Sequence, residues 1–175
     1  MLETLITSKT RVKLLMKFFL NYHTISYLRD LSAEFGESTN AIRLELNRME
    51  EAGLLLANHQ GNKKLFKANE KHPLFDGIRG LLLRHTGIDH IVEKVVKNLG
   101  GLHSAYLINS FARGIDSPEI TMLLVGSDMD EAYLDKVIPK AEEMIGRKIA
   151  YTIAPPEDAE GLLEHHPEAL LVWKE

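Results

Sequence analysis

Two stretches of this chain carry side chains whose types and spacing could do chemistry. The first is a run of hydroxyl, amide and guanidinium side chains at short helical intervals: Thr39, Asn40, Arg43, Asn47 and Arg48. On a helix, residues three and four apart project from the same face. Groups of these types can donate and accept hydrogen bonds at base edges or phosphates, although the plain alternative is an ordinary solvated helix face.

The second stretch reads NSFARGIDSPEITMLLVG and covers residues 109–126. A turn of small residues, containing Ser110, Arg113 and Gly114, precedes an apolar run that is typical of a buried strand. Such a turn can hold a phosphate, and carboxylates on the strand can then hold a metal ion. The chemistry of this stretch therefore depends on which residues stand on the strand.

The elements that would position the first stretch are three helices. Ser8 and Ser26 are suitable N-caps for two amphipathic segments, and Gly36 is suited to end the second. Ser38 is the expected N-cap of the third helix, and Gly53 is expected to end it. Its expected buried face holds three apolar residues: Ile42, Leu46 and Met49.

A basic hairpin is expected to follow these helices. Two strand-like pieces flank Gln60-Gly61-Asn62-Lys63, which is a hairpin turn signal. With this hairpin, about residues 5–70 resemble the winged helix-turn-helix domains of bacterial transcription regulators. The resemblance implies that the third helix enters the major groove of double-stranded DNA and that the hairpin touches the backbone. The implied DNA contacts are Ser38, Thr39, Asn40, Arg43, Asn47, Arg48, Lys63 and Lys64. A protein contact is the other use to which a winged helix is put.

Residues 71–98 are expected to form a helical connector. Pro73 suits the first turn of a helix, and Gly87 separates that helix from a second one. Both helices carry apolar stripes that need a neighbouring surface. Because many bacterial operators are pseudo-palindromes bound by two-fold dimers, a homodimer through this region is a reasonable hypothesis.

In residues 99–175 strands alternate with helices, which indicates a small α/β domain. The expected fold class is thus a two-domain α/β chain, with an α+β winged helix at residues 1–70 and the α/β domain after the connector. The second stretch, with Ser110, Arg113 and Gly114, resembles the signature of minimal bacterial nucleotidyltransferases over about residues 99–153. That family has two aspartates on the strand after the turn and a third acid on a later strand.

This sequence departs from that signature where metal binding is concerned. Asn109 stands in place of the first glycine, and Glu119 and Thr121 stand in place of the two aspartates. The later strand, KIAYTI, offers no acid. Nucleotidyl transfer relies on Mg²⁺ held by hard oxygen ligands, so we expect a non-catalytic domain with no metal or cofactor. The alternative is an active nucleotidyltransferase that the winged helix recruits.

A non-catalytic domain can still bind a ligand. Ser110, Arg113 and Gly114 could hold a phosphate-bearing small molecule, whereas in the purely structural interpretation Arg113 pairs with an acid such as Asp116. Other candidate sites are weaker. Ser127 or Asp128 is expected to cap the following helix, with the neighbouring acids at its N-terminus. The adjacent His165 and His166 point apart on a regular element, so they are not expected to chelate a metal jointly.

The overall composition is that of a globular protein without redox chemistry at sulfur. The 175 residues include no cysteine, and the formal net charge is −4. Residues 1–70 hold 10 basic and 8 acidic side chains, whereas residues 71–175 hold 11 and 17. The sequence shows no signal-peptide pattern and no apolar stretch long enough to span a bilayer, so we expect a cytoplasmic protein with no membrane partner.

Overall fold

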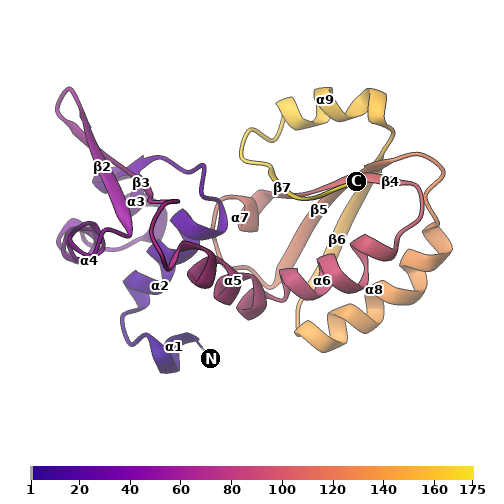
Figure 1. Ribbon diagram of the computed structural model, residues 1–175, viewed down its shortest axis with the longest axis horizontal. Helices are drawn as coiled ribbons and strands as arrows, with labels where there is room; N and C mark the ends of the chain where they lie inside the picture. Colours follow the sequence, from indigo (N-terminus) through magenta and orange to yellow (C-terminus); the bar gives the residue numbers. More distant parts are fainter. Residues whose placement is uncertain (1) are drawn as a thin grey trace. The chain divides into compact units, whose positions relative to one another are not determined.

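The chain folds into two compact units, Met1–Leu82 and Leu83–Glu175. The structure is a computed structural model that describes residues 2–175, except for the side chain of Glu3 (Figure 1). Each unit contains helices and one small sheet. The predicted fold class, a two-domain α/β chain, is confirmed.

Three of the expected helix signals in the first unit, Ser8, Gly36 and Ser38, lie at helix ends. The helices are α1 (Leu2–Leu5), α2 (Lys9–Leu15), the π-helix η1 (Met16–Leu20), α3 (Leu28–Phe35) and α4 (Thr39–Glu51). Ser8 Oγ accepts a hydrogen bond from the Arg11 N–H at 3.2 Å, and Ser38 Oγ accepts one from the Ala41 N–H at 3.2 Å. Gly36 ends α3 in the left-handed conformation, with φ 64°. These caps fix where α2 and α4 start.

The sheet of the first unit has one strand more than the hairpin alone. Its strands are β1 (Ser26–Tyr27), β2 (Leu55–Gln60) and β3 (Lys63–Ala68), all antiparallel in the order β1-β3-β2. The sequence suggests Ser26 as the N-cap of α3, but this prediction is wrong. Ser26 lies in β1 and pairs with Phe66 of β3, so Tyr27 takes the N-cap position. The β2–β3 hairpin projects from the helices as an extended arm (Figure 1).

The core of the first unit is built from the apolar faces of these helices. Its largest fully buried side chains are Leu14, Phe18, Phe19, Leu20, Leu31, Ile42, Leu46 and Leu55. Burial of such side chains is the main stabilising contribution to a small domain. The core therefore holds α4 at a fixed angle to the hairpin.

Two helices occupy the segment that was expected to connect the domains. They are α5 (Phe75–Thr86) and α6 (Ile88–Lys94), and the short 3₁₀ helix η2 (Val96–Asn98) follows. Gly87 separates α5 from α6 with φ 83°, a conformation that glycine adopts without strain. A Cβ at this position would lie 2.7 Å from Ile145, so glycine is required there.

The second unit is a four-stranded sheet with helices on both faces. Its strands are β4 (Leu102–Ile108), β5 (Glu119–Gly126), β6 (Lys148–Ala154) and β7 (Leu170–Lys174), in the order β6-β5-β4-β7. Only β5 and β6 run parallel. The helices are α7 (Asn109–Ala112), α8 (Glu131–Ile145) and α9 (Pro156–Glu164).

The alternation of side chains along β5 supplies both faces of this sheet. Leu123 and Val125 form a buried cluster against Leu162 and Leu163 of α9. Met122 and Leu124, which alternate with them along β5, point to the opposite face of the sheet. The helices α6 and α8 lie on that side (Figure 1). Asp130, rather than Ser127 or Asp128, caps α8 by accepting from the Tyr133 N–H at 2.9 Å.

No helix in residues 2–175 is long and apolar enough to cross a membrane.

Candidate nucleic-acid interface

The outer face of α4 is polar and open to solvent. Ile42, Leu46 and Met49 are buried, as the sequence predicts, and they fix the rotation of the helix about its axis. The opposite face exposes Thr39, Asn40, Arg43, Asn47 and Arg48. Packing of one face thus presents the predicted base-reading side chains on the other.

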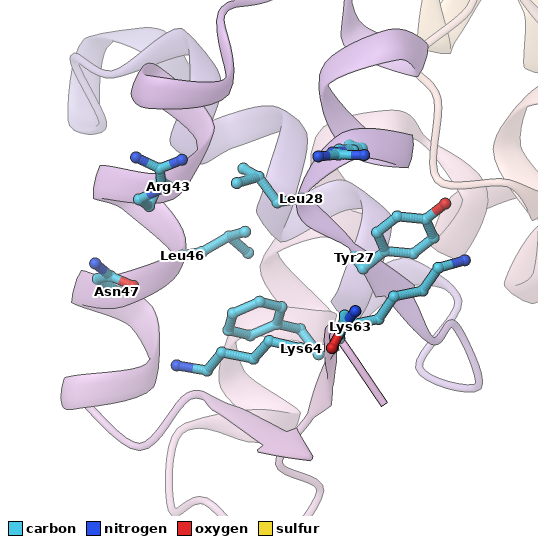
Figure 2. A pocket seen from close by; sticks show the side chains of 10 residues that line it. Tyr27, Leu28, Arg43, Leu46, Asn47, Lys63 and Lys64 are labelled. Atoms are coloured by element: carbon cyan, nitrogen blue, oxygen red, sulfur yellow. The ribbon is translucent and has the colours of Figure 1, made fainter. Parts of the chain in front are cut away.

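A cavity of about 550 Å³ lies between α4, the start of α3 and the β2–β3 hairpin (Figure 2). Its floor is apolar and aromatic, whereas its rim is cationic and amide-bearing. The lining residues are Tyr27, Leu28, Arg29, Arg43, Leu46, Asn47, Asn62, Lys63, Lys64 and Phe66. Four of them are basic and none is acidic, so the walls concentrate positive potential in the cavity.

The two hairpin lysines are held in different ways. Lys63 Nζ lies 4.3 Å from the centroid of the Tyr27 ring, and its side chain has no carboxylate partner among the described residues. Lys64 Nζ donates to Glu50 Oε2 at 2.5 Å and lies 5.2 Å from the Phe66 ring centroid. The charge of Lys64 is therefore partly compensated, and the charge of Lys63 is not.

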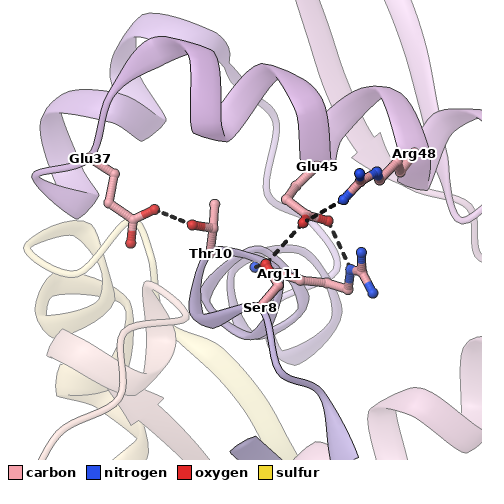
Figure 3. Close-up of polar contacts among 6 residues, drawn as sticks. All are labelled: Ser8, Thr10, Arg11, Glu37, Glu45 and Arg48. Carbon is pink, nitrogen blue, oxygen red and sulfur yellow. Dashed lines mark hydrogen bonds and ion pairs between the residues drawn. The ribbon is translucent and has the colours of Figure 1, made fainter.

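A buried carboxylate links α2 to α4. Glu45, which is 6% exposed, accepts hydrogen bonds from Ser8 Oγ at 2.9 Å, Arg11 Nε at 2.8 Å and Arg48 Nη1 at 3.2 Å (Figure 3). Burial alone would raise the pKa of Glu45, but the hydrogen bonds from Arg11 and Ser8 and the two guanidinium charges lower it. Glu45 therefore stays charged at neutral pH and holds the guanidinium groups of Arg11 and Arg48.

A second carboxylate fixes the turn between α3 and α4. Thr10 Oγ1 donates to Glu37 (Figure 3). Lys13 Nζ also donates to Glu37 Oε1, at 2.5 Å. Burial would raise the pKa of Glu37, but these two donors lower it. Glu37 thus fastens the α3–α4 turn to α2, and Glu45 fastens the middle of α4 to the start of α2.

The structure gathers half of the eight predicted contact residues around the cavity. Arg43, Asn47, Lys63 and Lys64 line it. The other four lie outside it: Ser38 and Thr39 at the start of α4, Asn40 on its outer face, and Arg48, whose side chain is 61% exposed although it is paired with Glu45.

Sequence reasoning missed two lining residues with cationic or amide side chains, Arg29 and Asn62. Asn62 is part of the predicted hairpin turn, so its position could have been found. Arg29 is the second residue of α3, and only the pairing of β1 with β3 brings that end of α3 beside the hairpin.

In the turn after β4, which is the second candidate site, one backbone donor is already hydrogen-bonded to another residue of the chain. Asn109 has φ 61°, a left-handed conformation, and its N–H donates to Glu168 Oε1 at 3.2 Å. His166 Nδ1 lies 3.3 Å from the same oxygen. Burial would raise the pKa of Glu168, but backbone hydrogen bonds, including that from Asn109, and His166 lower it. A carboxylate of this chain thus occupies a position that an anionic ligand would need.

The other residues of the turn serve its shape. The carbonyl oxygen of Ser110 accepts from the Ile115 N–H at 2.9 Å, and Gly114 has φ 72°. Arg113 is exposed and has no ion-pair partner among the described residues. Asp116, the acid suggested as its partner, instead pairs with Arg147 at 2.7 Å.

The strand after this turn offers little to a metal ion. Glu119 is exposed at the start of β5, and Thr121 pairs with Ile108 of β4 and Ala150 of β6. The described residues contain no group of three or more His, Asp or Glu side chains that could hold a metal. His165 bonds through Nδ1 to the Gly161 carbonyl at 2.7 Å, so it does not act with His166.

No protein-family model matches the chain, and no curated protein matches it. Similar solved structures include a protein provisionally described as a nucleotidyltransferase from Sulfolobus solfataricus, at 20% identity and a TM-score of 0.38, covering 56% of this chain and 86% of that one. A mutant of ZitR from Lactococcus lactis, in apo form, has 18% identity and a TM-score of 0.39, covering 55% and 70%.

A third structure, a candidate transcriptional regulator for arsenical resistance, has 20% identity and a TM-score of 0.32, covering 54% of this chain and 90% of that one. Likenesses at these TM-scores assign no function to the chain. Function is determined by the residues of a site and not by the fold that carries them.

Proposed function

We propose that this chain is a DNA-binding transcription regulator, in which α4 enters the major groove and the β2–β3 hairpin contacts the phosphate backbone. The observation that carries the proposal is the cavity beside α4, whose lining includes four basic side chains and no acidic one. Double-stranded DNA is a dense polyanion, and neutralising its phosphates releases counterions and drives association. The lining thus suits a polyanionic partner better than an apolar or basic one.

The side chains divide into two roles. Arg43 and Asn47 stand on α4, where guanidinium and amide groups can make bidentate contacts to guanine and adenine edges. Arg29, Lys63 and Lys64 surround the cavity and neutralise phosphates. Thr39, Asn40 and Arg48 extend the polar face beyond the cavity, and Ser38 sets the start of the helix.

The proposal is tested by selecting duplexes from a random-sequence library with the full chain at moderate salt. The enriched duplex and a scrambled version are then titrated by fluorescence anisotropy. We expect Arg43→Ala to lose about 1–3 kcal/mol of binding free energy on the enriched duplex and to relax preference at one base pair. Arg113→Ala removes another exposed arginine, far along the sequence, and should leave the affinity unchanged when no small molecule is added.

Two outcomes would contradict the proposal. Equal affinity of the wild-type chain for enriched and scrambled duplexes would remove the sequence-specific claim. No affinity for any duplex at moderate salt would point to an adaptor that uses its winged helix for protein contacts.

For the second unit the proposal is a non-catalytic role. Glu119 and Thr121 supply a single carboxylate to the strand where a two-metal mechanism needs several acidic ligands. Labelled nucleoside triphosphates with Mg²⁺ or Mn²⁺ and candidate acceptors test this point. Turnover that Glu119→Gln abolished would establish an enzyme instead.

Ligand sensing by this unit is a further part of the proposal. The exposed guanidinium of Arg113 supports binding of a phosphate-bearing small molecule beside Ser110 and Gly114. Glu168 opposes it, because its carboxylate takes the Asn109 N–H. Calorimetric titration of the chain with inorganic phosphate and with ATP measures whether either ligand binds despite Glu168.

A homodimer completes the proposal. Leu74, just before α5, is 61% exposed, and Leu81, seven residues later, is 39% exposed on the same helical face. An exposed apolar stripe of this kind supports a two-fold contact between copies. Sedimentation showing a monomer at micromolar concentration with DNA binding intact would contradict it.

A further inference from the structure

One exposed leucine interrupts the polar face of α4. Leu44 is 49% exposed, whereas the other apolar residues between Thr39 and Glu51 that are longer than alanine are buried. Burying the side chain of leucine typically stabilises a protein by about 1.5–3 kcal/mol, so the core gains nothing from this leucine as it stands. Its side chain is therefore available to a binding partner.

Leu44 lies at the centre of the face that the proposed function places against DNA. Asn40 is four residues before it and Asn47 is three residues after it, so the three side chains project side by side. The opposite face holds Ile42 and Met49 in the core. Leu44 therefore points away from the protein, in the same direction as the amides.

The surroundings of Leu44 do not form an apolar patch. Its neighbours one helical turn away on α4 are Asn40, Asn47 and Arg48, which are polar and exposed, and Ala41, which is half-buried. Protein-docking surfaces usually contain several adjoining apolar residues. A single apolar side chain among hydrogen-bonding ones suits a partner that presents one apolar group among polar edges.

The major groove of DNA has this chemistry. Among the groups that the four bases display there, the C5-methyl of thymine is the apolar one, and the rest are hydrogen-bond donors and acceptors. We propose that Leu44 packs on the methyl group of one thymine and makes the protein prefer that base between the positions contacted by Asn40 and Asn47. This inference rests on the proposed function, since it requires α4 to lie in the major groove.

The test removes the methyl group without changing any hydrogen-bonding group. The enriched duplex is resynthesised with each thymine replaced in turn by deoxyuridine, and the affinity of the full chain is measured by anisotropy. One replacement should weaken binding about fourfold, which corresponds to about 0.8 kcal/mol for one buried methyl-sized group. The other replacements should change the affinity less.

The variants assign that effect to Leu44. Leu44→Ala should bind the enriched duplex more weakly than the wild type does. It should also bind the enriched duplex and the duplex with deoxyuridine at the sensitive position with the same affinity. Leu44→Met keeps an apolar side chain of similar volume and should retain the difference. Because Leu44 is exposed, circular dichroism of both variants should match that of the wild type.

The outcomes separate the two proposals. If no duplex is enriched, the proposed function fails. If a duplex is enriched but deoxyuridine is neutral at every position, or if the difference persists in Leu44→Ala, DNA binding stands and the role of Leu44 is wrong. A sedimentation change in Leu44→Ala without thymine-methyl sensitivity would assign the side chain to a contact between proteins.

Discussion

The cavity beside α4 and the turn after β4 both present hydrogen-bond donors that suit an anion, but they differ in what those donors already hold. At the cavity, Lys63 and Arg43 have no carboxylate partner among the described residues. At the turn, the Asn109 N–H is already bonded to Glu168. Two cationic side chains of the cavity are therefore available to a ligand, whereas at the turn the backbone donor of Asn109 is satisfied internally and the exposed Arg113 guanidinium remains.

This difference shows that a glutamate can prepare a site or close it, according to what it binds. Glu45 binds Arg11 and Arg48 from the protein side and leaves 61% of the Arg48 side chain exposed. Glu168 instead sits where an incoming anion would sit. Both carboxylates have a lowered pKa, so the direction of the shift does not distinguish the two roles, and the position of each carboxylate does.

The largest expected effect comes from removing the charge of Glu45. Glu45→Gln weakens three hydrogen bonds to a buried group, so the free energy of unfolding at neutral pH should fall by about 1–3 kcal/mol. The folded-state pKa is lowered, so the stabilisation is present above the ordinary glutamate pKa of about 4.3 and is lost as the pH falls below it. Urea denaturation between neutral and acidic pH measures both effects.

The matched control is Glu51→Gln, which changes an exposed glutamate of the same helix and should alter the stability little.

The Glu45→Gln variant also tests whether Glu45 affects DNA binding through its charge or by positioning the two arginines. Removing a negative charge near the interface should strengthen DNA binding if charge alone matters, and should weaken it if Glu45 orients Arg11 and Arg48. Stronger binding at every salt concentration would contradict the positioning role.

The corresponding change in the second unit is Glu168→Gln, for which we expect a smaller loss of about 1 kcal/mol, because the side chain is 22% exposed. The free energy of unfolding of Glu168→Gln should vary less with pH than that of the wild type. The reason is that the lowered pKa of Glu168 stabilises the fold only above the ordinary glutamate pKa. DNA affinity should not change. Glu164→Gln at the exposed end of α9 is the control, and an equal effect of both variants would remove the distinction.

The smallest expected effect separates the two hairpin lysines. Lys63→Ala should weaken binding to every duplex severalfold and reduce the slope of log affinity against log salt by about 1. Lys64→Ala should reduce the slope less, because Glu50 already compensates its charge. Anisotropy titrations at several salt concentrations measure both slopes, and a larger change for Lys64 would show that the ion pair opens on binding.

Local features of the fold could be predicted from the sequence. Ser8, Ser38 and Gly36 mark helix ends through their own side chains or backbone freedom, and the strand–helix alternation after residue 99 follows from hydrophobic periodicity. The buried face of α4 follows in the same way. These signals act between residues a few positions apart, which is why one sequence suffices to find them.

The features that decide the sites join residues far apart. Arg11 and Glu45 are 34 residues apart, and Asn109 and Glu168 are 59 apart. Ser26 has the side chain of a helix cap, yet pairing with Phe66 places it in a strand. No spacing rule predicts such contacts, because they depend on how the elements pack, and tertiary packing overrides local preference.

The left-handed backbone of Asn109 has a consequence for substitutions at this position. Asparagine tolerates this conformation better than most side chains, and glycine tolerates it best. Exchange between these two residues would therefore leave the path of the chain unchanged while adding or deleting an amide beside the strand. A single replacement at this position therefore changes the polar groups beside the strand without rebuilding the sheet that supports it.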